Sequence, residues 1–227
     1  MQLTEHLEIK GILTCKTGLK IGGTKEAAGI GETDNPIIRH PITRLPYVPG
    51  SSLKGKMRSL LEWKYRPECQ NSGKPCDCGK CEVCELFGSN NIRTTYHPTR
   101  LIFRDALLTE ESQKELQETL PGSFIEEKTE IAMNRSTGAT RDRSLRQQER
   151  IPEGTTFRFA LTMRLFDIDK QARSRYLEMV AEAVDMLEKD YLGGSGTRGY
   201  GKVALTANDG KTPLSQEIKN LAAGKAA

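Results

Sequence analysis

The chain has 227 residues, enough for one large domain or two small ones with a proper hydrophobic core. Hydrophobic residues make up 36% of it and charged residues 28%, which fits a soluble globular protein, and a net charge of +4 does not by itself indicate a nucleic-acid binder. The first residues form no secretion leader and no run approaches about 18 apolar residues, so we expect a cytoplasmic protein that makes no membrane contact.

The first predicted element is a strand near the amino terminus. Its apolar positions alternate with polar ones and are Leu7, Ile9, Gly11 and Leu13. An irregular, glycine-rich stretch follows from Gly18 to about Pro36. Within this stretch Asp34 and Asn35 stand directly before a proline, and this local chemistry predicts a turn.

A helix is predicted from about residue 52 to 65. Its apolar face has helical spacing and consists of Leu53, Met57, Leu60 and Leu61. Pro49 and Gly50 mark its start, and either Ser51 or Ser52 can cap it.

The same helix carries a basic cluster. Lys54 and Arg58 are four residues apart and therefore share a face, with Lys56 beside them. The free amide groups at a helix start suit a phosphate. The alternative is an ordinary solvated helix face.

Five of the six cysteines lie between Cys69 and Cys84, which favours a metal over disulfides in a chain without a secretion leader. Four thiols fall within nine residues, at Cys76, Cys78, Cys81 and Cys84. Gly79 permits the turn that a tetrahedral zinc site needs. We predict one structural zinc ion on these four thiolates, with Cys69 or His97 as substitutes for Cys76. The alternative is an unmetallated loop of reduced thiols.

Further elements follow in the second half of the chain. Residues 100–108 are predicted as one strand, and residues 109–154 as an insertion that begins acidic and ends rich in arginine. A clean alternation predicts a strand from Phe157 to Leu165. A helix then shows an apolar stripe at Leu177, Val180, Val184, Leu187 and Tyr191. Val203 to Thr206 is the last predicted strand, and the polar tail from Asn208 onward is expected to be loosely held.

The predicted order is β-α-β-β-α-β, which indicates an α+β chain with a ferredoxin-like core, the topology that RNA-recognition motifs share. We expect a single domain over residues 1–227. Its core takes up about 1–65, 98–108 and 155–207, with a zinc-binding insertion at 66–97, a protruding insertion at 109–154 and a polar tail at 208–227. The chain lacks an aromatic-rich strand of the RNA-recognition type.

Residues 192–202 form a glycine-rich segment between the second helix and the last strand. Five of its eleven residues are glycines, which allow sharp turns and close approach of another backbone. Arg198 and Lys202 add positive charge, and Tyr200 offers a ring for stacking. A plain glycine-rich turn is the alternative.

Four segments in this order resemble the RAMP superfamily of CRISPR systems, and in particular the backbone subunit of type III-A (Csm) effector complexes. They are Ile30–Ile38, Tyr47–Arg58, Arg100–Ala106 and Leu192–Lys202. The resemblance runs from about Leu7 to Leu205. It implies a CRISPR guide RNA, a complementary target RNA, further copies of the chain and other subunits of the complex as partners.

The resemblance also assigns roles to residues. The predicted first helix and the glycine-rich loop would grip the guide backbone through Ser51, Ser52, Lys54, Lys56, Arg58, Arg198 and Tyr200. Residues 109–154 would contain a β-hairpin thumb that enters the guide–target duplex and flips out a nucleotide. Ile125, Ile131 and Met133 are the candidate wedge residues.

Asp34 matches the aspartate with which such subunits cut target RNA. The implied reaction is a transesterification assisted by Mg²⁺ or another divalent ion, which leaves a 2′,3′-cyclic phosphate and a 5′-hydroxyl. Asp34 would bind the ion or accept the 2′-hydroxyl proton, and His40 would either assist or be a surface residue. Three alternatives are a purely architectural RNA-binding subunit, a guide-processing endonuclease and a stand-alone zinc-stabilised binding protein.

Overall fold

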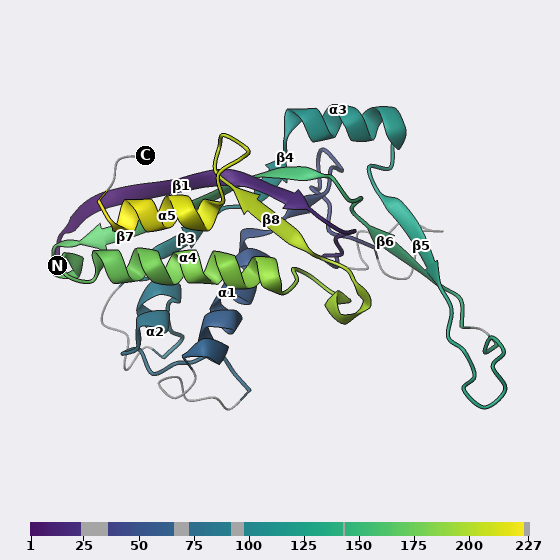
Figure 1. Cartoon of the computed structure of the whole chain (residues 1–227), viewed down its shortest axis with the longest axis horizontal. Coiled ribbons are helices and arrows are strands. Elements are labelled where there is room, and N and C mark those ends of the chain that lie inside the picture. Colours follow the sequence, from purple (N-terminus) through teal and green to yellow (C-terminus); the bar gives the residue numbers. More distant parts are fainter. Residues whose placement is uncertain (24–35, 66–72, 92–97, 143, 225–227) are drawn as a thin grey trace.

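The computed structural model describes residues 1–23, 36–65, 73–91, 98–142 and 144–224. They form a mixed α/β fold in which an antiparallel sheet is covered by helices and a two-stranded hairpin protrudes from one end (Figure 1). The segment that contains Asp34 lies outside the described residues, as do Cys69, His97 and Arg143. None of the helices in the described part of the chain is long and apolar enough to span a bilayer.

Two long strands form the centre of the sheet. β1 (Leu3–Cys15) pairs antiparallel with β7 (Thr156–Phe166) over nearly its whole length. β8 (Val203–Thr206) lies on the other side of β1. With β2 (Tyr47–Val48) and β4 (Ala106–Leu108), the strand order is β2-β4-β7-β1-β8, and β3 (Leu101–Phe103) also pairs with β7. The predicted alternation is confirmed, because Leu13, Phe157 and Phe159 are buried while their strand neighbours are not.

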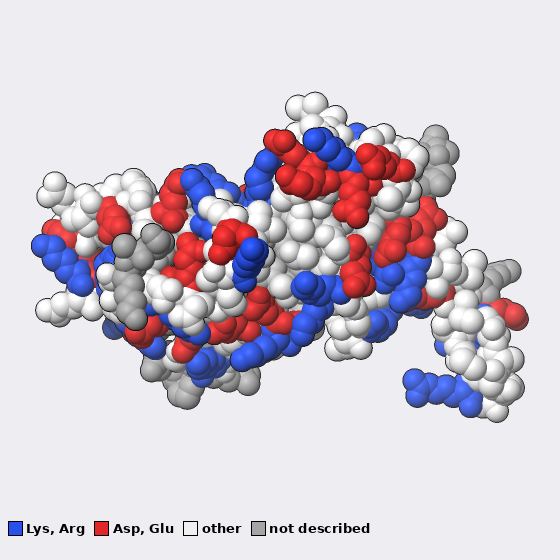
Figure 2. Space-filling view, turned by 45° about the horizontal axis from the view of Figure 1, so that its top comes forward, with Lys and Arg blue, Asp and Glu red and all other residues white. Residues whose placement is uncertain are grey.

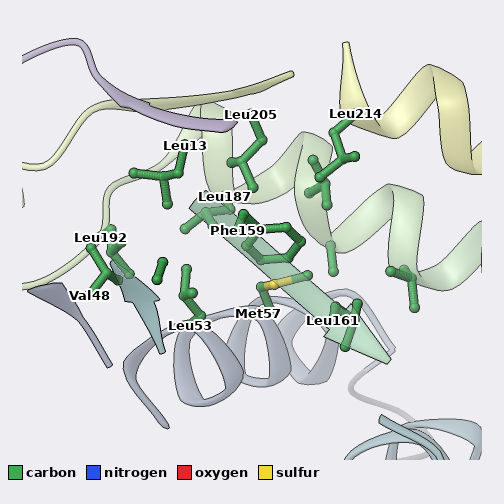
Figure 3. Close-up of a cluster of buried hydrophobic side chains, with 14 of the residues drawn as sticks. Leu13, Val48, Leu53, Met57, Phe159, Leu161, Leu187, Leu192, Leu205 and Leu214 are labelled. Atoms are coloured by element: carbon green, nitrogen blue, oxygen red, sulfur yellow. The ribbon is translucent and has the colours of Figure 1, made fainter. Parts of the chain in front are cut away.

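Two helices close the core against the sheet. α1 (Gly50–Lys64) and α4 (Arg173–Lys189) contact each other and present their apolar stripes to the strands. In Figure 3, Met57 of α1 lies against Phe159 of β7, and Leu53 rises from the same helix into the core. The spacing that predicted these helices therefore reflects burial against one sheet face.

The predicted strand at 100–108 is in fact two short strands, and the predicted serine cap of α1 is absent. β3 ends at Phe103, and β4 (Ala106–Leu108), which pairs with β2 (Tyr47–Val48), begins after Asp105. The Asp105 carboxylate turns toward α1 and accepts a hydrogen bond from the Gly50 amide at 2.8 Å. Pro49 is the N-cap residue. The free amide at the start of α1 is therefore bound by the Asp105 carboxylate and not, as we predicted, by the side chain of Ser51 or Ser52.

The expectation of a loosely held tail is wrong for residues 214–222. They form α5 (Leu214–Ala222), which packs on α4 and β8 and fully buries Leu214 and Ile218. Lys219 pairs with Asp185 of α4 at 2.8 Å. Two apolar residues four apart are enough to make a helix adhere, although the tail as a whole is polar.

The insertion at 109–154 contains a helix and the protruding hairpin. α3 (Glu110–Thr119) begins at Thr109, whose side chain accepts a hydrogen bond from the Ser112 amide at 3.2 Å. β5 (Glu126–Glu130) then pairs with β6 (Arg146–Arg150), and the hairpin continues beyond them into an extended tip (Figure 1). Figure 2 shows acidic side chains gathered over α3 and basic side chains at the end of the hairpin.

A buried ion pair joins the sheet to the segment before α4. Arg100 donates to both carboxylate oxygens of Asp169, at 2.8 and 2.7 Å, and both side chains are almost fully buried. The Phe166 amide donates a third bond to Asp169 at 3.0 Å. The charges are thus completely partnered, a condition for tolerating them in an apolar interior.

We expect Asp169→Asn to destabilise the fold. The change leaves the Arg100 charge buried without a counter-charge, which lowers the free energy of unfolding by ~3–5 kcal/mol. Chemical denaturation measures this difference. The matched control is Glu178→Gln, an exposed position on α4, which is expected to change stability by less than about 0.5 kcal/mol. An Asn variant as stable as the parent protein contradicts this account.

Candidate functional site

The first candidate site is the cysteine cluster. The sulfur atoms of Cys76, Cys78, Cys81 and Cys84 all lie within 4.8 Å of one another. Cys76 and Cys81 are 3.9 Å apart, and Cys78 and Cys84 are 3.8 Å apart. Four thiolates about 2.3 Å from a tetrahedral ion are separated by about 3.8 Å. The cluster can therefore hold a metal ion, and Cys76 lies in it, while the alternatives Cys69 and His97 lie outside the described residues.

The local backbone folds so that its amide groups point at the sulfurs. Gly79 has φ +67°, the left-handed turn expected of it. The amides of Lys80 and Cys81 donate to the Cys78 sulfur at 3.5 and 3.4 Å, and Cys81 caps α2 (Glu82–Phe87) by accepting from Cys84. Burial opposes ionisation of Cys78, but these amide donors lower its pKa to about 7. The loop thus favours the thiolate form of Cys78, whereas burial raises the pKa of Cys84.

Arg58 belongs to this centre rather than to a phosphate site. Its guanidinium donates to Glu62 at 2.7 Å and also to the carbonyl oxygen of Cys76. Glu62 in turn accepts from the Cys76 amide at 3.0 Å. The carbonyl oxygen and the amide of Cys76 are thereby both hydrogen-bonded to side chains of α1. Arg58 is largely buried and engaged, so the structure does not leave it free beside Lys54 for an RNA phosphate.

The cysteine segment also shares the main hydrophobic core. Val83, Leu86 and Phe87 of α2 are buried in the same cluster as α1 and β7, and Phe87 stacks on Phe103 at 5.9 Å. Arg175 of α4 pairs with Glu82 at 3.1 Å. The described part of the cysteine segment is therefore packed on the main core and does not stand apart from the rest of the molecule.

We expect Cys81→Ser combined with Cys84→Ser to remove the bound metal. Two of four thiolates are then lost, and elemental analysis of the purified protein measures the metal content. Glu62→Gln is a milder change, expected to weaken metal affinity by about 10–100-fold in chelator competition because it loosens the hold on Cys76.

Lys80→Gln is the control, since this exposed lysine contributes only its backbone amide to the cluster. A double serine variant that keeps a full complement of metal contradicts the assignment.

The other basic residues of α1 differ in what they contact. Lys56 pairs with Asp190 at 2.9 Å and lies 3.8 Å from the Tyr191 ring, with its side chain only 17% exposed. It joins α1 to the end of α4 and is not free. Burial, and then Arg58, lower the pKa of Lys54, for which no ion pair is found among the described residues. Ser51 is exposed and Ser52 half-buried at the helix start.

The second candidate site is the glycine-rich loop. Gly193 has φ +76°, and a side chain there would come within 2.2 Å of the Lys20 carbonyl oxygen. The Gly194 amide donates to the same oxygen at 2.8 Å. Glycine is therefore required for the loop to lie against residues 16–22. An open groove of about 440 Å³ runs between this loop and the end of α4, lined among others by Thr17, Lys189 and Lys202.

Arg198 and Tyr200 of this loop meet at one carboxylate. Arg198 donates to Glu130 at 3.1 Å and keeps 54% of its side chain exposed. Tyr200 donates to the other Glu130 oxygen at 2.8 Å, with its ring between Lys128 and Arg150. That ring is 2% exposed. Stacking of a base on Tyr200 therefore requires a different conformation of the loop, whereas Arg198 is accessible as predicted.

The described residues on either side of the Asp34 segment are held together. Ile38 donates to Ile21 at 2.8 Å, and Gly23 to Pro36 at 3.0 Å. The Ile37 amide donates to Glu149 of β6 at 3.0 Å. The described residues that follow the Asp34 segment are therefore held against the base of the hairpin, while Asp34 itself lies outside the described residues.

His40 has a local role in the following turn. Its Nδ1 accepts from the amides of Ile42 and Thr43 at 3.4 and 3.3 Å, and its ring meets Tyr47 edge-on. This favours the interpretation of His40 as a structural surface residue over an assisting one. Glu130 and Glu149 were missed by sequence reasoning, since both lie in an insertion whose pairing with the loops cannot be inferred locally.

The candidate wedge residues separate by burial. Ile125 is buried in the core cluster at the base of the hairpin, so it cannot be a wedge. Ile131 and Met133 are exposed at the tip, and so is Leu145, which sequence reasoning did not single out.

These features define a protein with a helix-covered antiparallel sheet, a cysteine cluster, a glycine-rich loop and a protruding hairpin. The chain belongs to the RAMP superfamily, which matches residues 12–204. Within it the chain belongs to the family of Csm3 proteins. It is 44% identical over 218 residues to the "CRISPR system Cms endoribonuclease Csm3" of Methanothermobacter thermautotrophicus, covering 89% of this chain and 84% of that relative. The resemblance found in the sequence is confirmed.

Other relatives agree. The protein of the same name from Streptococcus thermophilus is 40% identical over 190 residues, covering 84% of this chain and 82% of the relative. The crystal structure of the Csm3–Csm4 subcomplex in the type III-A CRISPR-Cas interference complex matches with a TM-score of 0.63 at 25% identity, over 100% of both chains. The Methanopyrus kandleri Csm3 crystal structure shares the fold, with a TM-score of 0.58 at 22% identity over 89% of this chain and 77% of that one.

Proposed function

We propose that this protein is a CRISPR RNA-binding backbone subunit of a type III-A interference complex and an endoribonuclease. Several copies assemble along the guide RNA beside other subunits, and each copy cuts the complementary target RNA once, at regular intervals. The observation that carries the proposal is a convergence at one end of the sheet. There the ends of the Asp34 segment, the glycine-rich loop and the base of the hairpin contact one another through Glu149, Lys20 and Glu130.

The core of this subunit is ferredoxin-like in our proposal. Four strands run in the order β8-β1-β7-β3 with α1 and α4 as the two crossing helices, the order of that topology. The zinc-binding segment at 66–97 and the thumb region at 109–154 are insertions into this one domain. The tip of the hairpin, with Ile131 and Met133 exposed, is the wedge that enters the duplex.

Asp34 is the catalytic residue in this proposal. The 2′-hydroxyl of the flipped target nucleotide attacks the adjacent phosphorus, the P–O5′ bond breaks, and a 2′,3′-cyclic phosphate and a 5′-hydroxyl result. Asp34 takes the 2′-hydroxyl proton or holds a divalent ion. When bound, Mg²⁺ or a similar ion neutralises charge on the reacting phosphate.

The cysteine cluster holds zinc in a structural role. Four thiolate ligands at tetrahedral spacing are typical of structural zinc, and they leave no open position for water. The zinc site therefore takes no part in the cleavage step.

Guide RNA is held by the groups that the fold leaves accessible. These are the start of α1 at Ser51 and Ser52, together with Lys54 and the exposed part of Arg198. Lys189 and Lys202, which line the groove beside the glycine-rich loop, extend this basic surface. A subunit that binds guide RNA and cuts target RNA needs access to the RNA of the cell, so we assign it to the cytoplasm of a prokaryote.

We expect Lys54→Ala and Arg198→Ala each to weaken guide RNA binding regardless of base sequence. Each lost phosphate contact should lower the slope of log affinity against log salt by about 0.7–0.9, because fewer counterions are released. Binding titrations at several salt concentrations measure both quantities.

Lys211→Ala is the control, since it removes the same charge from an exposed turn that belongs to neither RNA-binding segment. Unchanged affinity and slope in the Lys54 and Arg198 variants mean that these residues do not contact the guide.

We expect Asp34→Ala to abolish target cleavage while assembly and target binding persist. A chelator of divalent ions should also stop the wild-type reaction. Since the attacking group belongs to the substrate, a single 2′-deoxy nucleotide at one cut position should block that cut alone. Mapping of labelled target fragments measures all three effects.

Normal cleavage by Asp34→Ala means that another residue or another subunit cuts the target. The alternative of a purely architectural RNA-binding subunit is then favoured. Cleavage that persists across the 2′-deoxy position makes water the nucleophile and refutes the transesterification.

A further inference from the structure

One carboxylate joins two parts of the molecule that are far apart in sequence. Glu130 is the last residue of β5, at the point where the paired base of the hairpin passes into its tip. Its two oxygens accept from Arg198 at 3.1 Å and from Tyr200 at 2.8 Å. A single side chain of the hairpin is therefore bound to both functional side chains of the glycine-rich loop.

The surroundings make this contact selective for an ionised carboxylate. The hydrogen bond from Tyr200, followed by the charges of Arg198, Lys128 and Lys20, lowers the pKa of Glu130. Lys128 and Arg150 lie 4.9 and 5.2 Å from the Tyr200 ring and hold it beneath the carboxylate. Removal of the negative charge deprives Arg198 of the carboxylate that it binds and takes an attractive charge away from Lys128 and Lys20.

Among the described residues, Glu130 lies between the part of the hairpin that is bonded to the core and the part that is not. Nearer the core, the β6 side is tied down by backbone bonds between Ile151 and Leu19, at 2.8 and 2.9 Å. Beyond Glu130, described tip residues bond to one another, as Ala132 does to Ser144 at 3.3 Å. The exposed Ile131 follows Glu130 directly. A small rotation at Glu130 thus becomes a larger displacement at the tip.

Arg198 can hold Glu130 and a phosphate at the same time. Its Nη1 donates to Glu130 and its Nη2 to Ser195 at 2.8 Å, while 54% of the side chain stays exposed. A guanidinium has five N–H donors, so others are left for an anion. The contact with Glu130 therefore orients Arg198 and does not block it.

We propose that Glu130 is a positioning residue that clamps the thumb hairpin to the guide-binding loop, and that this clamp determines which target phosphate each subunit cuts. The inference rests on the proposed function. Arg198 holds the guide backbone, and Glu130 ties the hairpin to Arg198. The tip is then placed relative to the guide RNA itself, so the flipped nucleotide falls at a constant distance from each guide phosphate.

The test is Glu130→Gln in the assembled complex with guide RNA. The change keeps the size of the side chain but removes its charge and one of the two acceptor oxygens that Arg198 and Tyr200 use. We expect target cleavage to continue, with the cut at each site spread over the neighbouring phosphates on either side. Fragment ends mapped at single-nucleotide resolution show this directly. A purely structural role would slow every cut equally without moving any of them.

Two further variants sharpen the test. Tyr200→Phe removes one of the two bonds to Glu130 and should give a smaller spread, and the double variant should spread no further than Glu130→Gln alone. Glu127→Gln is the matched control, because it removes a carboxylate from the exposed side of the same strand and should keep the cuts at single positions.

If the Glu130→Gln complex cuts only at the wild-type positions, the proposal that Glu130 acts as a clamp is wrong. If that variant does not assemble, Tyr200→Phe decides, with single-position cuts again counting against the proposal. Hydrogen exchange gives a second readout in the isolated protein, where Glu130→Gln should raise exchange roughly tenfold in residues 126–130 and 196–202. Unchanged exchange there overturns the clamp, whereas a wild-type complex that cuts nothing refutes the proposed function instead.

Discussion

The pairing of β1 with β7 is the interaction on which the rest of the structure depends. Residues along these strands alternate between the two sheet faces, so a shift by one residue would turn the core outward. Leu13 pairs with Phe157 and Ile9 with Leu161, and all four are buried. Where the pair ends, at Thr14 and Thr156, the chain leaves β1 toward residues 16–23 and enters β7 from the hairpin. Both functional segments are therefore placed by one strand register.

Many of the basic side chains are used in ion pairs that stabilise the fold. Lys56, Arg58, Arg100 and Arg175 are each held by a carboxylate, and two of them connect α1 to other parts of the molecule. With a net charge of only +4, the chain depends on placing its remaining cations well. In the function that we propose, Lys54, Lys202 and the exposed half of Arg198 are the cations that remain for an RNA backbone, which they would attract without a strongly basic surface.

Sequence predicted the parts of this structure whose cause is local. Burial against a sheet imposes the spacing seen in α1, α4, β1 and β7, and the cysteine spacing reflects the turn at Gly79. The four cysteines that come together could thus be named from the sequence, and their role as metal ligands stays a prediction. The α5 helix was missed because its burial depends on two residues, Leu214 and Ile218, within a polar stretch.

Two of the predicted RNA-binding residues have partners within the chain that the sequence did not indicate. Lys56 meets Asp190, and Tyr200 meets Glu130 and Arg150, partners that are 50 or more residues away. Nothing in the neighbouring sequence marks those pairings. Arg58 is different, since Glu62 lies four residues on and could have been recognised as its helical partner. A basic residue on a helix should therefore be assigned to a ligand only after its i+4 neighbours have been considered.

The location of Arg58 links the stability of the metal centre to the geometry of α1. One guanidinium bonds to Glu62 on its own helix and to Cys76 in the cluster, while Leu53, Met57 and Leu61 hold the opposite face of α1 against the sheet. A displacement of Cys76 therefore shifts α1 as well, and the start of this helix carries Ser51, Ser52 and Lys54. In the function that we propose, a zinc centre that takes no part in chemistry would still affect how firmly the guide-binding surface is held, because the cysteine loop and the start of α1 share one helix.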